Sequence, residues 1–188
     1  MNGPLSTEDA RDIPLAANGD EAAARRLYER YAADVARQMW RFTRDPVIHQ
    51  DLAQDVWISA FRNLREFRGE APFPHWIRRI ATHTGYRFWK RQARDLERRR
   101  AYEAEQHTTA APANPETPVE AAEQLHALLA LLPPDQRLVL TLFYLEECGV
   151  SEIADRTGWS ASKVKVCNMR ARQRMKTLLE EHGYERTS

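Results

Sequence analysis

Side chains that could bind phosphate are concentrated near the C-terminus. The stretch from Arg156 to Leu179 holds seven Lys and Arg residues and no Asp or Glu. Just before and within it, Ile153 and Ala154 supply an apolar face, and Gly158 stands where a helix commonly ends. Ser160 then offers the hydroxyl that caps the open amides of a new helix. A short helix, a glycine turn and a cationic second helix are the pattern of a helix-turn-helix that binds DNA.

The second helix of this pair divides into a buried stripe and an exposed face. Its residues advance about 100° each, so the stripe that packs on the domain is Val164, Ala171, Met175 and Leu178. On the opposite side, Val166 or Met169 could contact a thymine methyl group. Near the helix start, Lys163 or Lys165 could reach guanine, and in the preceding helix Arg156 is expected to grip the DNA backbone. The residues expected to bind DNA here are Arg156, Ser160, Ser162, Lys163, Lys165, Val166, Met169, Arg170, Arg172 and Gln173.

A second cationic block lies earlier in the chain, from Arg62 to Arg100, with twelve Lys and Arg residues against four acids. Because the whole chain carries a net charge of only +1, both blocks stand on an acidic background. This arrangement indicates two separate contacts with a polyanion. The residues expected to follow phosphates are Arg78, Arg79, Arg87, Lys90, Arg91 and Arg94, and the alternative is that they form only a solvated helix face.

The loop before this helix, from Phe67 to Pro74, combines a glycine with two prolines and two phenylalanines. A loop that accepts an extruded base beside a cationic track gives binding energy that exists only for opened DNA. Arg68 can pair with a phosphate. Phe73 is expected to anchor the loop in the core because Trp76 and Ile77 lie in register with it, whereas Phe67 could either anchor the loop or stack on a base.

The elements that position these residues are all predicted as helices, since no alternating strand pattern occurs. We expect an all-α fold of two small helical domains joined by a flexible linker. Residues 1–19 are polar and contain prolines, and we expect them to form a disordered leader. The first domain is predicted over 20–101, with a chain break at Asp45-Pro46. A proline-rich linker over 102–118 and a second domain over 119–182 follow.

Composition excludes several classes of protein. No apolar run approaches the ~20 residues that span a bilayer, and the N-terminus lacks the plan of a secretory signal. Cys148 and Cys167 form no disulfide framework, and the six histidines are not spaced as metal ligands. We therefore expect a cytoplasmic protein with no catalytic residue, no metal and no cofactor.

Two stretches together resemble the extracytoplasmic-function (ECF) sigma factors of the sigma-70 family. The stretch from Asp51 to Ala81, DLAQDVWISAFRNLREFRGEAPFPHWIRRIA, is similar to their region 2. The later stretches ALLPPDQRLVLTLFYL and SEIADRTGWS are similar to their region 4. The resemblance covers Glu21 to Glu180. The chain departs from the family in both regions. In region 2, the family often has Asn at the position of His83 and an acid or Asn at the position of Arg87. In region 4, it commonly has Ser, Arg and Leu at the positions of Val166, Cys167 and Asn168.

This resemblance implies specific partners. Region 2 would dock on the clamp helices of the RNA polymerase β′ subunit and would melt and read the promoter −10 element. His83 is expected to bind this DNA together with the cationic helix face and the loop. Region 4 would sit on the β flap and read the −35 element. The residues expected at the polymerase are Asp51, Leu52, Gln54, Asp55 and Val56. Family members are typically held off by an anti-sigma factor, and we expect a monomer that joins polymerase one to one.

Other functions explain the sequence less well. An operator-binding regulator that never joins polymerase would account for the C-terminal domain, but not for the basic helix beside an aromatic loop in the first domain. An enzyme lacks both a phosphate-cradling glycine loop and a catalytic cluster. A redox switch through Cys148 and Cys167 is disfavoured because small buried cysteines are usually inert.

Overall fold

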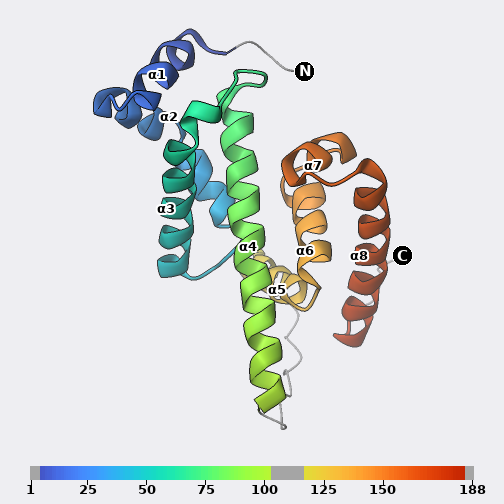
Figure 1. Cartoon of the computed structure of the whole chain (residues 1–188). Coiled ribbons are helices and arrows are strands. Elements are labelled where there is room, and N and C mark those ends of the chain that lie inside the picture. The colour runs from blue at the N-terminus through green and yellow to red at the C-terminus, as the bar shows by residue number, and fades with distance from the viewer. Residues whose placement is uncertain (1–4, 103–116, 185–188) are drawn as a thin grey trace. The chain divides into compact units, whose positions relative to one another are not determined.

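The computed structural model describes residues 5–102 and 117–184 and is all-helical over these ranges, which confirms the expected fold class (Figure 1). The chain forms two compact units, Met1–Phe88 and Trp89–Ser188. They divide inside one long helix rather than at the expected linker, of which residues 103–116 lie outside the described part of the chain. The expected domain boundaries therefore stay predictions, and each unit is described by itself.

The first unit contains α2 (Glu21–Met39), α3 (Pro46–Arg62), the 3₁₀ turn η1 (Leu64–Glu66) and the part of α4 (Phe73–Tyr102) up to Phe88. Asp20 begins α2 by accepting a hydrogen bond from the Ala23 amide at 2.7 Å. Asp45 begins α3 in the same way, with the Val47 amide at 2.8 Å and Pro46 in the first turn. The expected break at Asp45-Pro46 is thus a helix start, because proline is tolerated where the amide has no intrahelical partner.

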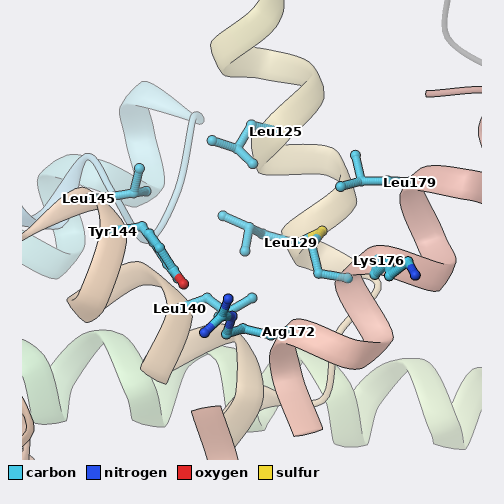
Figure 2. A pocket seen from close by; sticks show the side chains of 9 residues that line it. Leu125, Leu129, Leu140, Tyr144, Leu145, Arg172, Lys176 and Leu179 are labelled. Carbon is cyan, nitrogen blue, oxygen red and sulfur yellow. The ribbon is translucent and has the colours of Figure 1, made fainter. Parts of the chain in front are cut away.

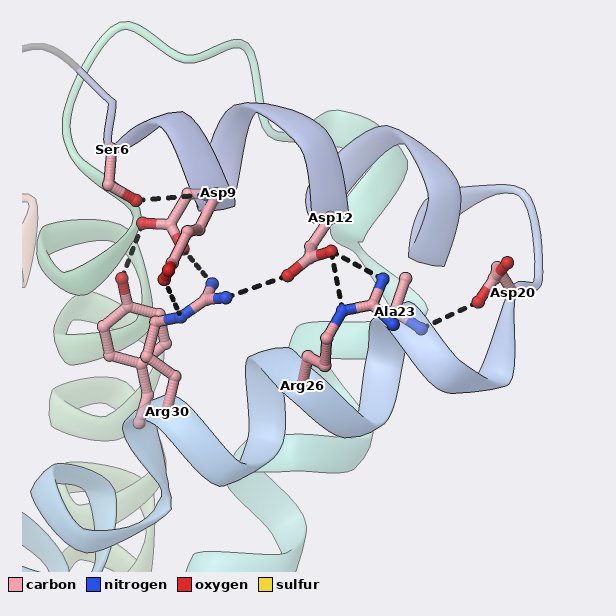
Figure 3. Close-up of polar contacts among 9 residues, drawn as sticks. Ser6, Asp9, Asp12, Asp20, Ala23, Arg26 and Arg30 are labelled. Atoms are coloured by element: carbon pink, nitrogen blue, oxygen red, sulfur yellow. Dashed lines mark hydrogen bonds and ion pairs between the residues drawn. The ribbon is translucent and has the colours of Figure 1, made fainter.

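An additional helix, α1 (Thr7–Ala17), corrects the expectation of a disordered leader for residues 5–19, and residues 1–4 lie outside the described part of the chain. Ser6 caps it, and its acids Asp9 and Asp12 are almost fully buried against α2. Figure 3 shows that these carboxylates face the cations of α2, chiefly Arg26 and Arg30. The leader was misread because its polar residues find partners in α2, which offset the cost of burying their charge.

Gly85 has a packing role in α4. A Cβ atom added there would lie 2.2 Å from Cδ1 of Phe42, whose ring is fully buried. A glycine in a helix costs about 1 kcal/mol relative to alanine, and here it makes room for an aromatic ring. Nearby, Gln38 on α2 donates a hydrogen bond to the Thr82 hydroxyl of α4 at 3.1 Å. These contacts fix α4 against α2 and the segment that follows it, over the turn that contains His83.

The second unit contains α5 (Pro118–Ala130), α6 (Pro134–Leu140), the π-helical segment η2 (Thr141–Leu145), α7 (Val150–Thr157) and α8 (Ala161–Glu181). Part of its core is formed by Leu129, Leu132, Leu140, Ala171 and Leu178. Helix α7 ends at Gly158, which is left-handed with φ of 74°. Ser160 then accepts a hydrogen bond from the Lys163 amide at 3.2 Å and begins α8. The helix–glycine–helix arrangement expected from the sequence is present.

Candidate nucleic-acid interface

Helix α8 presents the face expected from its periodicity. Val164, Ala171 and Leu178 are buried, as expected, and Met175 is partly buried. Val166 and Met169 are 44% and 62% exposed, although both are apolar. The other exposed residues of the expected reading face and its flanks are Ser162, Lys163, Lys165, Arg170, Arg172 and Gln173, with Ser160 at the N-cap. Exposed apolar side chains between cations suit a surface that meets base edges and phosphates together.

Lys163 makes two contacts within the second unit, with Trp159 and with Asp135. Its ammonium nitrogen lies 3.9 Å from the centroid of the Trp159 ring and 3.9 Å from Oδ2 of Asp135. Both contacts are weak because the lysine is about half exposed. The amine can therefore exchange them for a DNA group, and it starts from a restricted position at the beginning of α8.

Arg156 is buried beside this surface, which argues against its expected role on the DNA backbone, and that role stays a prediction. Its side chain is 9% exposed, and Nη1 binds Oε2 of Glu146 at 2.7 Å. Nη2 binds Glu152 one turn earlier in α7. With both ends of the guanidinium engaged, Arg156 ties α7 to the end of η2. The sequence did not reveal this because Glu146 is ten residues away, across a turn.

The loop after η1 leads into a cluster of aromatic rings. Phe73 is 1% exposed and packs on Tyr31, with ring centroids 5.4 Å apart, which confirms its expected place in the core. Phe67 is partly buried, with its ring centroid 5.6 Å from that of Phe73 and 5.3 Å from that of Trp76. Arg68 is exposed and lies 3.9 Å from Glu70, a contact of little strength. The ring of Phe67 therefore rests against the core at the edge of the solvent-facing loop.

Helix α4 carries an exposed cationic face beside this loop. Arg79, Arg87, Lys90, Arg91 and Arg94 are exposed on it, and Arg78 is partly buried.

His83 lies on the same helix and is also partly buried. Burial lowers the pKa of His83, and the charges of Arg79 and Arg87 lower it further. The imidazole is thus neutral at pH 7, so the positive charge of this face comes from its arginines and lysines.

The expected polymerase-binding residues of α3 divide into two groups. Asp51, Gln54 and Asp55 are exposed, as a docking surface requires. Leu52 and Val56 are 3% and 0% exposed and belong to the core, which argues against direct docking, and their expected role at the polymerase stays a prediction. Their one-turn spacing places both on the inner face of the helix.

Two exposed apolar residues of α3, Val47 and Ile58, were missed. They follow the helical repeat of Asp51, Gln54 and Asp55, at steps of four, three, one and three residues. That spacing was the available signal. The outer face of α3 therefore combines acids with apolar groups.

An apolar pocket of about 350 Å³ opens in the second unit between α5, η2 and α8. Figure 2 shows Leu125 and Leu129 on one side, with Arg172, Lys176 and Leu179 of α8 on another. Tyr144 stands at its edge and is 59% exposed. Sequence reasoning missed this pocket, because periodicity does not reveal whether a neighbouring helix covers an apolar face.

Cysteine and metal chemistry find little support. Cys148 and Cys167 are buried, and desolvation raises the pKa of Cys148 to about 12, so its thiol stays protonated and unreactive at neutral pH. Within residues 5–102 and 117–184, no group of three His, Cys, Asp or Glu side chains could hold a metal ion. None of the helices in these same ranges is long and apolar enough to cross a lipid bilayer.

Comparison with known proteins identifies both units. The family model of sigma-70 region 2 matches residues 27–95, and that of sigma-70 region 4 matches residues 122–175. The RNA polymerase sigma factor YlaC of Bacillus subtilis is 30% identical over 152 residues, which cover 80% of this chain and 88% of that protein. The ECF RNA polymerase sigma-E factor of Escherichia coli K12 is 30% identical over 168 residues, covering 82% and 85%.

Solved structures share the fold. CnrH, determined in complex with the cytosolic domain of CnrY, has a TM-score of 0.61 at 24% identity and covers 93% of this chain and 98% of its own. RpoE of Bartonella quintana, determined with the anti-sigma factor NepR, has a TM-score of 0.58 at 17% identity and covers 83% and 96%. The two family matches in order, with relatives that align over most of both chains, lead to one conclusion: the chain belongs to the ECF group of the sigma-70 family of RNA polymerase sigma factors.

Proposed function

We propose that this sigma factor binds core RNA polymerase through the outer face of α3 and directs it to promoters through two DNA-reading surfaces. One consists of α4 and the loop before it, and the other is α8. The observation that carries the proposal is that α4 and α8 each expose a cationic face, with uncharged side chains able to contact bases in the loop before α4 and on α8. An operator-binding regulator needs only one such surface.

At the −10 element, the exposed cations of α4 would follow the phosphates of the opened strand while the loop takes an extruded base. Phe67 rests on Trp76 and Phe73 at the edge of the core, and Arg68 extends into solvent. A base that stacks on Phe67 would meet a ring already held in place. Base–aromatic stacking contributes about 1–3 kcal/mol, and only unpaired bases can provide it.

At the −35 element, α8 would enter the major groove with its N-terminal half. Val166 and Met169 suit thymine methyl groups, while Lys163 and Lys165 suit guanine or phosphate. Arg170, Arg172 and Gln173 continue this exposed surface along the helix. Arg156 contributes indirectly by holding α7 in place.

Two further surfaces suit protein partners. The acids and apolar groups of α3 would bind the β′ clamp helices of polymerase. The pocket between α5, η2 and α8 would receive an apolar segment of the β flap, with Arg172 and Lys176 at its rim. An anti-sigma factor would cover one of these surfaces, since the structural neighbour RpoE was solved with the anti-sigma factor NepR. Sigma factors are in general not enzymes, and we propose a cytoplasmic monomer without catalytic activity.

Reconstitution tests this function. The protein is mixed with bacterial core RNA polymerase and transcribes a library of promoter fragments; specific transcripts that share two spaced elements are expected. Tight DNA binding without polymerase association would instead favour the operator-binding regulator.

Asp55→Arg should weaken binding to core polymerase about tenfold or more because it reverses a charge on the docking face. Glu29→Arg, an equal reversal on α2, is the matched control; equal losses in both variants would refute the assignment of α3.

A further inference from the structure

Helix α1 and Leu5, which precedes it, lie against the chain on both sides of Phe67, in the loop proposed above to bind the −10 element. Arg65 of η1 donates a hydrogen bond from Nε to the carbonyl oxygen of Ala17, at the end of α1, over 2.9 Å. At the other end, Cδ1 of Leu5 lies 3.2 Å from the position that a Cβ atom on Gly69 would take. Gly69 itself has a φ of +71°, which favours glycine. Helix α1 thus contacts this segment just before Phe67, and Leu5, which precedes the helix, lies close to it just after Phe67.

Between these two contacts, α1 and the loop line a common cleft of about 410 Å³. Ile13 and Pro14 contribute to it from α1, and Phe67, Arg68 and Gly69 from the loop. Of these three loop residues, Phe67 is the one proposed above to stack on the extruded base. The inner side of the loop therefore faces α1, while Arg68 remains exposed.

Helix α1 is itself firmly attached to α2. Oδ1 of Asp12 accepts hydrogen bonds from Nε and Nη2 of Arg26 at 3.0 and 2.7 Å, and Oδ2 accepts one from Arg30 at 2.9 Å. Asp9 accepts hydrogen bonds from Arg30 and from the Tyr31 hydroxyl, both at 2.5 Å (Figure 3). Both carboxylates are 2% exposed. Charge-assisted bonds of this kind, shielded from water, give α1 a fixed position.

We infer that α1 is a brace that holds the loop from Phe67 to Pro72 in the shape that captures the −10 base, with Arg65 and Leu5 as positioning residues. This inference rests on the proposed function of the loop. A loop held in its binding shape need not be ordered when DNA arrives, so more of the binding energy remains for opening the duplex. The brace acts on promoter opening and leaves polymerase docking and −35 binding untouched.

Arg65→Ala is the first test, in the full chain assembled with core polymerase. Open complexes are measured by permanganate reactivity of thymines in the −10 region of a promoter from the library. Loss of one hydrogen bond should reduce them about two- to tenfold. Arg65→Lys should recover at least half of this loss because an ammonium group can donate to the same carbonyl. Arg62→Ala is the matched control, since Arg62 is exposed, lies one turn earlier and removes the same charge.

Asp12→Ala and Leu5→Ala separate bracing from direct DNA contact. Asp12 faces α2 and removing its charge would favour DNA electrostatically, so a loss of open complexes can come only through α1. Leu5→Ala changes no charge. Both variants should open the promoter several-fold less than wild type. Binding to core polymerase and to −35 DNA should be unchanged, and circular dichroism melting confirms that each variant is folded.

The outcomes are distinct. The brace is overturned if the Arg65 and Leu5 variants open promoters as well as Arg62→Ala does, or if Arg62→Ala is equally defective. If Asp12→Ala unfolds the first unit, Arg65→Ala and Leu5→Ala decide, because neither removes a buried charge. If wild-type holoenzyme opens no promoter in the library, the proposed function fails and the brace fails with it.

Discussion

Replacing Arg156 should destabilise the second unit without removing a DNA contact. Arg156→Ala leaves Glu146 with a carboxylate that is 10% exposed and has lost its cation. Breaking a buried ion pair from one side typically costs 3–5 kcal/mol. We expect the lower end, about 3 kcal/mol, because the second partner, Glu152, is 44% exposed and can be hydrated. This corresponds to roughly a hundredfold shift in the unfolding equilibrium.

Hydrogen exchange followed by mass spectrometry measures this change in the intact chain. The slowest amides of α7 and α8 should exchange about a hundredfold faster in Arg156→Ala, while those of α2 and α3 stay unchanged. Arg172→Ala is the matched control on an exposed cation. It should leave exchange unaffected, weaken DNA binding and reduce the slope of log affinity against log salt by about 1.

The double variant Glu146→Gln/Arg156→Met sharpens the test. It removes both charges at once, so it should be more stable than Arg156→Ala if the loss of this buried ion pair from one side is the cause. The reasoning is refuted if Arg156→Ala retains full protection and shows the reduced salt slope expected of Arg172→Ala. Arg156 would then bind the DNA backbone after all.

Two other predictions concern the first unit. Gly85→Ala should destabilise it by about 1–3 kcal/mol in chemical denaturation, because the new methyl group overlaps the Phe42 ring. Gly149→Ala, with open space around its Cβ atom, is the control. An unchanged stability of Gly85→Ala would contradict the packing of Phe42 against Gly85. His83 has a folded-state pKa below its ordinary value, so its contribution to stability is present above about pH 6.5 and is lost as pH falls through the lower, folded pKa. Wild type should therefore lose more stability than His83→Gln between pH 7 and pH 5 in denaturant titrations, and equal losses would show that His83 does not titrate there.

Local sequence patterns predicted the helical segments well. The 3.6-residue period indicated which side of α8 is buried, and Gly158 and Ser160 marked the turn between α7 and α8. These features depend on neighbours within a few residues, so the sequence contains them directly. The paired region 2 and region 4 stretches likewise identified the family without a structure.

Only the tertiary structure decided which polar and apolar residues find distant partners. Asp9 and Asp12 turned an expected leader into α1 because Arg26, Arg30 and Tyr31 lie opposite them, 14 to 22 positions later in the chain. Arg156 is buried because Glu146 lies opposite it. Gly85 leaves space for the ring of Phe42, which comes from another segment. A residue's type and its helical phase define what it can do, whereas the element packed against it determines whether its charge is paired, buried or offered to a ligand.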